Sequence, residues 1–502
     1  MAFVLTNEEM READFYTIET CGVSALELME RAGRALADAA DRLAPTGKIL
    51  CVCGGGNNGG DGFVCARVLS ARGRETDALC IAEKFSDGCA ENKARFLDVG
   101  GRILTEFSSE DYALVVDCMF GTGFKGGLQG EYEMLAKHIN QARTLGVKVL
   151  AADIPSGISG EDGFAPTSAV RADQTLCIGE IKTGVLQNDG IDFAGEILRE
   201  DIGICLPKAD YAILSDKNSA RTALPPRKRN AHKGIYGRAA IVGGCAAYTG
   251  APYLSAAACL RSGAGYTALY LPDGLLSSYR LKLPEALLDG ISTGEEIVFE
   301  EARFAKLLSC SAIAYGMGAG VSEDVFRGAA YLLKHYAGTL ILDADGLNAL
   351  AKYGKSQYEA LFQNKKCEVV LTPHVKEFSR LTGESVEAVL RKGATLAKEF
   401  AHKYGVTVLL KNAVSVITDG RRTYFNATGN SGQAKGGSGD VLAGVIAGLC
   451  ACGASGVDGA RLGAYLVGRA AELAAEKIGE YSLTASDLTS YLGAAFLDLQ
   501  TE

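Results

Sequence analysis

The residues best suited to catalysis form a glycine-rich run, GNSGQAKGGSGD, from Gly429 to Asp440, directly before an apolar segment that begins at Val441. Glycines at the start of a helix expose backbone N–H groups, and the positive end of the helix dipole adds to them. A phosphoryl group transferred at such a place is stabilised as its charge redistributes. Asp440, held at the helix start, can take a proton from an attacking hydroxyl. A glycine turn capped by Asp440 would explain only part of this run, so the pattern favours a phosphoryl-transfer site.

A second glycine-rich run, GGGNNGGDG from Gly54 to Gly62, follows an apolar stretch and precedes a predicted helix. It formally contains the GxGxxG pattern of dinucleotide-binding loops, but that pattern alone is weakly specific. A dinucleotide pyrophosphate would lie at the helix N-terminus, where the Asp61 carboxylate would repel it. The run is therefore predicted to bind a polar ligand or a cation.

Two further polar segments, DCMFGTG from Asp117 and DIPSG from Asp153, follow predicted strands. Because open α/β sheets bind ligands beyond the carboxyl ends of their strands, these segments and the Gly54 run are expected to meet in one crevice. Asn58, Asp117 and Ser156 would offer only oxygen ligands there, which suits a hard cation rather than zinc or copper. Taken singly, Asp117 and Asp153 are explained better as helix-capping or turn residues.

Alternating strands and helices must position these residues, and this alternation is typical of a parallel sheet covered on both faces. In the first half we predict strands at 48–53, 76–81, 113–117 and 148–153, and helices at 8–20, 24–42, 60–72 and 132–145. In the second half we predict strands at 238–242, 312–315, 339–342, 368–371 and 406–410, and helices at 251–261, 441–450 and 456–478. The hydrophobic periodicity stops between residues 206 and 233. Within this stretch, the segment 223–229 contains two prolines and cannot hold a helix. We therefore predict two α/β domains, residues 1–214 and 215–502.

Length and composition narrow the class of protein. The 502 residues suffice for two to four domains, and the net charge of −9 argues against a nucleic-acid polymer or an anionic membrane surface as the main partner. The apolar stretch from Val441 to Val457 is rich in Gly and Ala and is flanked by Asp440 and Asp458, which favours a buried helix and turn over a membrane span. The 15 cysteines contain no CxxC pair, which indicates reduced thiols and a cytoplasmic location.

The first half resembles the NAD(P)H-hydrate epimerases, because it contains LMERAG, GGGNNGGDG, VVDCMFGTG and ADIPSG in this order. The resemblance implies a Rossmann-like three-layer αβα fold, a potassium ion held by Asn58, Asp117 and Ser156, and interconversion of the R and S epimers at the hydroxylated ring carbon of the nucleotide. An acid or base beside that carbon is needed, and Asp117 is the candidate. The implied substrate contacts are Asn57, Asn58, Gly59, Gly60, Asp61, Gly121, Thr122, Gly123, Phe124, Lys125, Gly126, Gly127 and Asp153.

The second half resembles the ribokinase-like superfamily through GGSGD at 436–440, and HKG, YTGA, GMGAG, DADGLN and TPH precede it in the order of the ADP-dependent NAD(P)H-hydrate dehydratases. The resemblance implies a ribokinase-like three-layer αβα fold. It also implies phosphorylation of the hydrate's hydroxyl by ADP with Mg²⁺, then loss of phosphate, which leaves AMP. Asp440 would be the base and contact the substrate. The other implied contacts are Ala251, Gly318 and His374 to the hydrate, and Lys411, Asn412, Ala413, Val414, Ser415 and Gly439 to AMP.

Three residues depart from the dehydratase pattern. Asn412 stands where Gly usually follows the lysine, and we expect it to hold the same turn because Asn tolerates positive φ. Ser431 and Lys435 replace the commoner Pro and Thr, and Lys435 is expected to add a cation near the phosphate path.

His374 taken alone, a single histidine after proline, is explained better as a structural residue.

The resemblance covers the chain from about Asn7 to Phe496 and implies a bifunctional repair enzyme for the hydrates NADHX and NADPHX that uses ADP and forms a homo-oligomer. One alternative is a ribokinase-like kinase of a small alcohol with a non-catalytic N-terminal binding domain. A stable phosphorylated product with no NAD(P)H formed would favour it. Another alternative keeps the dehydratase and makes the first domain a binding or scaffold module, but the intact polar motifs of that domain count against this.

Overall fold

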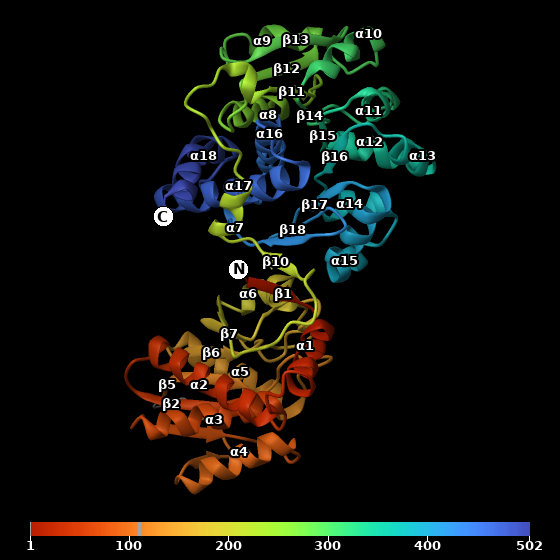
Figure 1. Cartoon of the computed structure of the whole chain (residues 1–502). Helices are drawn as coiled ribbons and strands as arrows, with labels where there is room; N and C mark the ends of the chain where they lie inside the picture. The colour runs from red at the N-terminus through yellow and green to blue at the C-terminus, as the bar shows by residue number, and fades with distance from the viewer. Residues whose placement is uncertain (1, 109–111, 502) are drawn as a thin grey trace. The chain divides into compact units, whose positions relative to one another are not determined.

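The computed structural model describes residues 2–108 and 112–501, which form two compact units (Figure 1). The N-terminal unit is Ala2–Tyr211, and the C-terminal unit begins at Ala212. Each is an α/β unit, as predicted. Strand β10 (Ala212–Leu214) lies before the predicted boundary at 214/215 and pairs in parallel with β19 (Thr423–Asn426) of the C-terminal unit.

The N-terminal unit is built on a sheet in the order β4-β3-β2-β5-β6-β7-β9, in which every described strand pair is parallel. Its strands are β2 (Lys48–Cys53), β3 (Thr76–Leu79), β4 (Arg102–Leu104), β5 (Tyr112–Cys118), β6 (Lys148–Ala152), β7 (Gln174–Ile178) and β9 (Glu196–Glu200). A separate parallel pair joins β1 (Ala2–Leu5) to β8 (Ile181–Lys182).

Helices cover both faces of this sheet, because successive side chains of a strand point to opposite faces. In β2, Ile49 and Cys51 enter one apolar cluster, whereas Leu50 and Val52 enter the other. Helices α2 (Ala25–Leu43), α3 (Asn57–Ala71) and α4 (Asp87–Asp98) contribute to the first cluster, and α5 (Gly130–Thr144) to the second. The remaining helices are α1 (Asn7–Glu19), which a capping box of Thr6 and Glu9 starts, and the short α6 (Asp189–Phe193).

The C-terminal unit has a sheet in the order β13-β12-β11-β14-β15-β16-β17-β18-β19-β10. The strands from β13 to β17 are parallel, and β18 is antiparallel to both of its neighbours. Besides β10 and β19, the strands are β11 (Arg238–Val242), β12 (Tyr266–Pro272), β13 (Leu287–Ser292), β14 (Ala312–Tyr315), β15 (Thr339–Leu342), β16 (Glu368–Leu371), β17 (Thr407–Leu410) and β18 (Ser415–Thr418).

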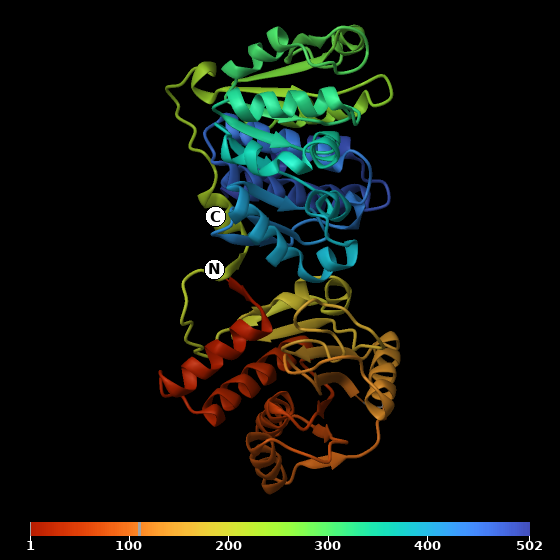
Figure 2. The ribbon, with the colours of Figure 1, turned by 90° about the vertical axis from the view of Figure 1, so that its right-hand side faces the viewer.

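Two groups of helices enclose this sheet (Figures 1 and 2). One face carries α8 (Gly250–Leu260), α16 (Ser438–Ala451), α17 (Gly456–Ile478) and α18 (Ala485–Gln500), and the other carries α11 (Glu323–His335), α12 (Asp345–Tyr353), α14 (Val375–Thr382) and α15 (Val386–Tyr404). The short helices are α7 (Lys217–Thr222), α9 (Leu276–Tyr279), α10 (Glu301–Phe304) and α13 (Tyr358–Gln363). Helix α16 packs tightly on α8, since a Cβ atom at Gly444 would lie 2.0 Å from the carbonyl oxygen of Ser255.

Most predicted elements are confirmed, and β2, β11, β14, β15, β16 and α17 have the predicted bounds. Helix α3 begins at Asn57 rather than Gly60, and α16 begins at Ser438 rather than Val441, so residues expected in loops lie in first helical turns. Helix α18 was not predicted, nor were several strands, which include β18 and β19. The aperiodic segment 206–233 contains β10 and α7, which are too short to show a periodic pattern.

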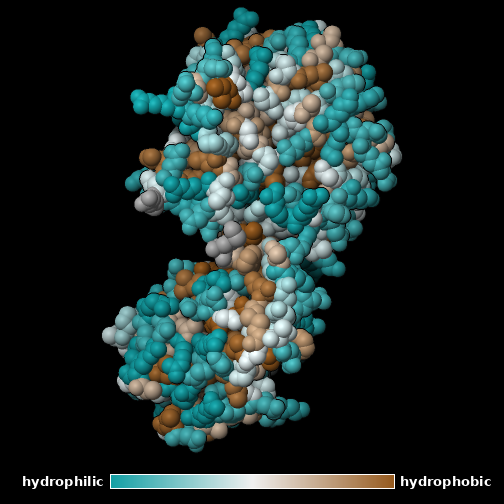
Figure 3. All heavy atoms as spheres, in the orientation of Figure 1, coloured by the Kyte–Doolittle hydropathy of each residue, from teal (hydrophilic) through white to brown (hydrophobic). Residues whose placement is uncertain are grey.

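No helix in the described part of the chain is long and apolar enough to cross a membrane. Hydrophilic residues cover most of the visible surface of each unit (Figure 3), as expected where the apolar strand residues are buried. All the cysteines are free thiols, and most of them are buried.

Candidate functional sites

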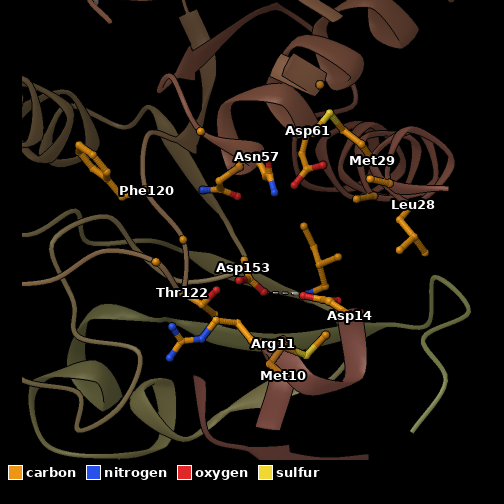
Figure 4. Close-up of a pocket in the computed structure, with 18 of the residues that line it drawn as sticks. Met10, Arg11, Asp14, Leu28, Met29, Asn57, Asp61, Phe120, Thr122 and Asp153 are labelled. Carbon is orange, nitrogen blue, oxygen red and sulfur yellow. Dashed lines mark hydrogen bonds between the residues drawn. The ribbon is translucent and has the colours of Figure 1, made fainter. Parts of the chain in front are cut away.

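A cavity of about 880 Å³ opens in the N-terminal unit, where the segments after β2, β5 and β6 meet α1 and α2 (Figure 4). The three polar segments therefore converge, as expected from their places at strand ends. Of the predicted contacts, the cavity wall includes Asn57, Asn58, Asp61, Gly121, Thr122, Gly123, Phe124, Lys125 and Asp153. It does not include Gly59, Gly60, Gly126, Gly127, Asp117 or Ser156.

Gly59 and Gly60 are required by packing rather than by an open ligand surface. A Cβ atom at Gly59 would lie 1.9 Å from the carbonyl oxygen of Gly54, and one at Gly60 would lie 2.5 Å from the Met29 sulfur. Such distances exclude any side chain, because interiors are close-packed. These glycines let the first turn of α3 pass closely over the end of β2 and against α2, which turns Asn57, Asn58 and Asp61 toward the cavity.

An ion pair at the cavity joins Asp153 to Lys182, a residue that the motifs did not single out. The Lys182 side chain is only 2% exposed, and its ammonium donates to the Asp153 carboxylate and to the carbonyl of Ile178 at 2.5 Å. Asp153 has φ +69°, an uncommon value for a residue other than glycine, which directs its carboxylate at Lys182. Because Lys182 lies in a two-residue strand, no local pattern marks it.

Two more carboxyl groups line the same cavity, Asp61 from α3 and Asp14 from α1. Burial raises the pKa of Asp14 to about 6, with Lys182 opposing and Asp153 adding to the shift. Burial, with the charges of Asp153 and Asp14, raises the pKa of Asp61 well above its usual range. Asp14 was not predicted, because a single acidic residue on an amphipathic helix carries no signal of function.

Asp117 lies beneath the cavity wall rather than on it, which corrects the expectation that it contacts the reacting carbon. It is fully buried and accepts hydrogen bonds from the Ser156 backbone N–H at 2.8 Å, the Ser156 hydroxyl at 2.7 Å and the Met119 N–H at 3.2 Å. Burial raises the pKa of Asp117 to about 6 despite these hydrogen bonds. The carboxylate thus ties the segment after β5 to the segment after β6.

The donor set predicted for a cation is in place only in part. Asp117 and Ser156 are hydrogen-bonded to each other, and the buried Asn58 amide has no hydrogen-bond partner among the described residues. An amide, a hydroxyl and one carboxylate supply only oxygen donors and a single negative charge. This chemistry fits a monovalent hard cation better than a transition metal, and no group of three or more His, Cys, Asp or Glu residues suited to a metal occurs within the described chain.

In the C-terminal unit, Asp440 lies in the first turn of α16, after Gly437 with φ +98°. The Ser255 hydroxyl of α8 donates to the backbone carbonyl of Asp440 at 2.8 Å and fixes this turn. Burial and the charge of Asp343 raise the pKa of Asp440 to about 7, and Lys411 opposes the shift. A carboxyl group with this pKa can gain and lose a proton near neutral pH, as a general base must.

A buried ion pair lies beside Asp440. The Lys411 ammonium donates to the Asp343 carboxylate at 2.7 Å, and the Thr372 hydroxyl donates to the same oxygen at 2.7 Å. A Cβ atom at Gly439 would lie 3.2 Å from Lys411 Nζ, so the ammonium lies against the start of α16. Asp343 belongs to the DADGLN motif, but the sequence analysis predicted no individual role for it. Its place at the end of β15 is equivalent to that of Asp117 at the end of β5, and this signal could have singled it out.

His374 caps a helix, which is the structural role expected of it when it is considered apart from the TPH motif. It also lies near Lys411 and Asp343. Its Nδ1 accepts hydrogen bonds from the N–H groups of Lys376 and Glu377, and these cap α14. An isolated parallel β-bridge pairs the backbone of His374 with that of Lys411. Burial and the charge of Lys411 lower the pKa of His374. Its Nε2 lies 3.5 Å from the Glu377 carboxylate. Burial also raises the pKa of Glu377 to about 7.

The structure brings some of the other predicted contacts together. Gly318 has φ +62°, and a Cβ atom there would lie 3.1 Å from that of Ala251. Asn412, Ala413 and Val414 form the turn between β17 and β18, and Ser415 begins β18. Asn412 is not among the described non-glycine residues with positive φ, so this turn does not need glycine. The Lys435 ammonium donates to the carbonyls of Tyr481 and Leu483, both at 2.6 Å, and its expected place near the phosphate path stays a prediction.

Comparisons with known proteins agree with the two-unit organisation. Residues 25–184 match the family described as YjeF-related protein N-terminus, and residues 239–493 match NAD(P)H-hydrate dehydratase. A bifunctional NAD(P)H-hydrate repair enzyme of Thermofilum pendens is 35% identical, over 98% of this chain and 96% of that protein. One of Moorella thermoacetica is 32% identical, over 100% of this chain and 98% of that protein.

A solved structure supports the assignment of the C-terminal unit. The ADP/ATP-dependent NAD(P)H-hydrate dehydratase of Bacillus subtilis, co-crystallised with ATP/Mg²⁺, covers 58% of this chain and 99% of that chain, with 29% identity and a TM-score of 0.50. The predicted ribokinase-like fold is confirmed by this likeness. With two families matched in order and relatives similar over their whole length, the chain belongs to the bifunctional NAD(P)H-hydrate repair enzymes.

Proposed function

We propose that the N-terminal unit interconverts the R and S epimers of hydrated NADH and NADPH, and that the C-terminal unit dehydrates the S epimer while ADP becomes AMP and phosphate. The observation that carries the proposal is the placement of Asp440 and the Lys411 ammonium at the start of α16. Two fused activities suit a single damaged cofactor, since the epimerase converts the isomer that the dehydratase does not use.

Kinase machinery can serve a dehydration because hydroxide is a poor leaving group and phosphate is a good one. Asp440 would take the proton of the hydrate's hydroxyl as that oxygen attacks the terminal phosphorus of ADP. The N–H groups of the first turn of α16 and the Lys411 ammonium would stabilise the charge on the transferred group. The carbon–oxygen bond then breaks, phosphate leaves with the bonding electron pair, and loss of a proton from the adjacent ring carbon restores the double bond of the nicotinamide ring. Mg²⁺ would enter with ADP.

In the N-terminal unit, we assign Asp117 to loop positioning and cation binding. Together with Asn58 and Ser156 it would hold K⁺, which when bound would supply a fixed positive charge next to the Asp117 carboxylate. The hydrate would occupy the cavity between Asp61, Asp153 and the segment from Gly121 to Lys125. The unpartnered Asn58 amide supports the cation, and the cavity volume supports a nucleotide-sized ligand.

The experiment is to follow absorbance at 340 nm while the full chain acts on mixed R and S NADPH hydrate in KCl and MgCl₂, with ADP, ATP or no nucleotide. An ADP-dependent rise that continues past the S fraction is expected, after correction for spontaneous epimerisation. A rise that stops at the S fraction would make the N-terminal unit a binding module. A stable phosphorylated product without any rise would favour the small-alcohol kinase.

The preference for ADP over ATP and a homo-oligomeric state remain predictions from the resemblance, and a cytoplasmic location remains a prediction from the cysteines. The first is measured in the same assay, in which we expect a higher kcat/KM with ADP. The second is tested by light scattering of the purified full chain, for which we expect a mass that is a multiple of 52.6 kDa.

A further inference from the structure

The N-terminal cavity holds three carboxyl groups, and they do not have equal surroundings. Asp153 is paired with Lys182 and also accepts the Ile178 N–H at 3.3 Å. Asp14 and Asp61 have no hydrogen bond or ion pair with any described residue, although both are partly buried. A buried carboxyl group without a protein partner is costly unless it serves a ligand.

The two unpartnered groups come from separate elements. Asp14 projects from α1 and Asp61 from the first turn of α3, and both point toward the open centre of the cavity from different sides (Figure 4). A ring bound between them would present one face to each carboxyl group. This is the arrangement required of an enzyme that inverts a stereocentre, which must act on both faces of one carbon.

We propose that Asp14 and Asp61 form the acid–base pair of the epimerase, acting on opposite faces of the hydroxylated ring carbon. The inference rests on the proposed epimerase function, and it assigns a role to Asp14, which no sequence motif covers. Asp153 and Lys182 would instead position the substrate, because each already has a partner.

The step is balanced without any oxidant or reductant. In one direction the Asp61 carboxylic acid gives its proton to the hydroxyl, the carbon–oxygen bond breaks, and water leaves with the bonding electron pair. The lone pair of the adjacent ring nitrogen forms the carbon–nitrogen double bond. A water molecule then attacks the opposite face while the Asp14 carboxylate takes its proton. The two carboxyl groups have exchanged protonation states, and turnover in the other direction or exchange with solvent restores them.

The charges around the pair suit these roles. Asp153 and Lys182 face both carboxyl groups, and Arg11 of α1 lines the same cavity. Burial and the charges of Asp153 and Asp14 raise the pKa of Asp61 well above its usual range, and burial raises the pKa of Asp14 to about 6. Two carboxyl groups in such unequal surroundings can supply one acid and one base.

The test uses the full chain without ADP, so that only epimerisation proceeds, starting from purified S NADPH hydrate in H₂¹⁸O with KCl. Chiral chromatography with mass detection follows R formation and ¹⁸O uptake. Asp14→Asn and Asp61→Asn should each lower kcat at least a hundredfold, with KM changed less than about threefold. Each inversion by the wild-type protein should bring in one ¹⁸O atom. Glu12→Gln, an exposed acidic position on the same helix that pairs with Lys208, is the matched control and should keep the wild-type rate.

Three further readouts separate chemistry from folding. ADP-dependent dehydration of S hydrate should be unchanged in all variants, because it takes place in the other unit. The unfolding temperature of Asp14→Asn at pH 8 should equal or exceed that of the wild type, because the amide avoids ionising a buried acid. Formate should restore part of the epimerase rate of Asp14→Ala by filling the vacated space.

The results that would overturn the inference differ from those that would overturn the proposed function. If the wild-type protein does not interconvert R and S hydrate, the epimerase function itself fails. If it does, the pair is refuted by a rate within threefold of wild type in either Asn variant, by inversion without ¹⁸O uptake, or by a folded Asp14→Ala protein that formate does not rescue.

Discussion

The glycine-rich runs of the two units are similar in sequence, but their glycines have different structural roles. At the start of α3, a Cβ atom at Gly59 or Gly60 would meet other protein atoms at 1.9 Å and 2.5 Å, respectively. At the start of α16, Gly436 has nothing within 4 Å, and Gly439 meets only the Lys411 ammonium at 3.2 Å and the Asp343 carboxylate at 3.8 Å. Gly59 and Gly60 are therefore required by packing, whereas the open space at Gly436 and the nearby ammonium at Gly439 suit a phosphate at the start of α16.

The acidic residues that follow these glycines differ in the same way. Burial, together with the charges of two other carboxyl groups, Asp153 and Asp14, raises the pKa of Asp61 well above its usual range. Asp440 faces the carboxyl groups of Asp343, Asp345 and Glu377 but also Lys411, and its pKa is held to about 7. One position therefore suits an acid and the other a base.

The strongest test of this contrast is Asp440→Asn. Loss of the base should lower kcat for dehydration by about a thousandfold or more, whereas epimerisation without ADP should remain at the wild-type rate. The measurement is absorbance at 340 nm with S hydrate and ADP, beside chiral chromatography without ADP. Loss of both activities in the folded variant would contradict two separate sites.

Replacing one glycine in each run tests whether packing or ligand access requires it. Gly59→Ala forces a contact with a backbone oxygen and should destabilise the N-terminal unit by about 3 kcal/mol or more. Gly436→Ala should change the free energy of unfolding by less than about 1 kcal/mol but raise KM for ADP. Urea unfolding and steady-state kinetics measure these effects, and equal destabilisation by both changes would remove the distinction.

Lys411→Met tests the cation that distinguishes the C-terminal site. It leaves the Asp343 carboxylate, which is 1% exposed, without its ion-pair partner, and should cost about 3 kcal/mol of stability as well as activity. The double variant Lys411→Met/Asp343→Asn should regain most of the stability but not the dehydration rate. Urea unfolding of the three variants measures the coupling, and recovery of the rate in the double variant would show that the ammonium does not act on the phosphate.

The smallest expected effect is on pH dependence. Since the pKa of Asp440 is raised to about 7 and its ionised form is the base, kcat/KM for dehydration should be constant well above pH 7 and fall about tenfold per pH unit below it. Rates with S hydrate between pH 5.5 and 9 check this, with Asp440→Asn as the control that should lack the inflection. A rate that rises as the pH falls would assign Asp440 the role of acid.

The amino-acid sequence by itself determined the alternation of strands and helices and the location of most polar motifs. Apolar strands such as β2 and β11 are buried on both faces, so they appear as continuous apolar runs with clear ends. The motif order also identified the family. The helix that carries Asp440 is recognisable because it is apolar on every side, although the pattern does not show that its first turn starts before Val441.

Only the tertiary structure decided which side chains meet and which are buried. Asp14 and Asp61 share a cavity although 47 positions separate them, and Lys411 reaches Asp343 over 68 positions. Asp117 proved to be buried beneath the cavity and hydrogen-bonded to Ser156 rather than exposed to a ligand. Periodicity reports how a segment contacts its immediate surroundings, whereas such pairings and the pKa shifts that come with them depend on how distant segments pack.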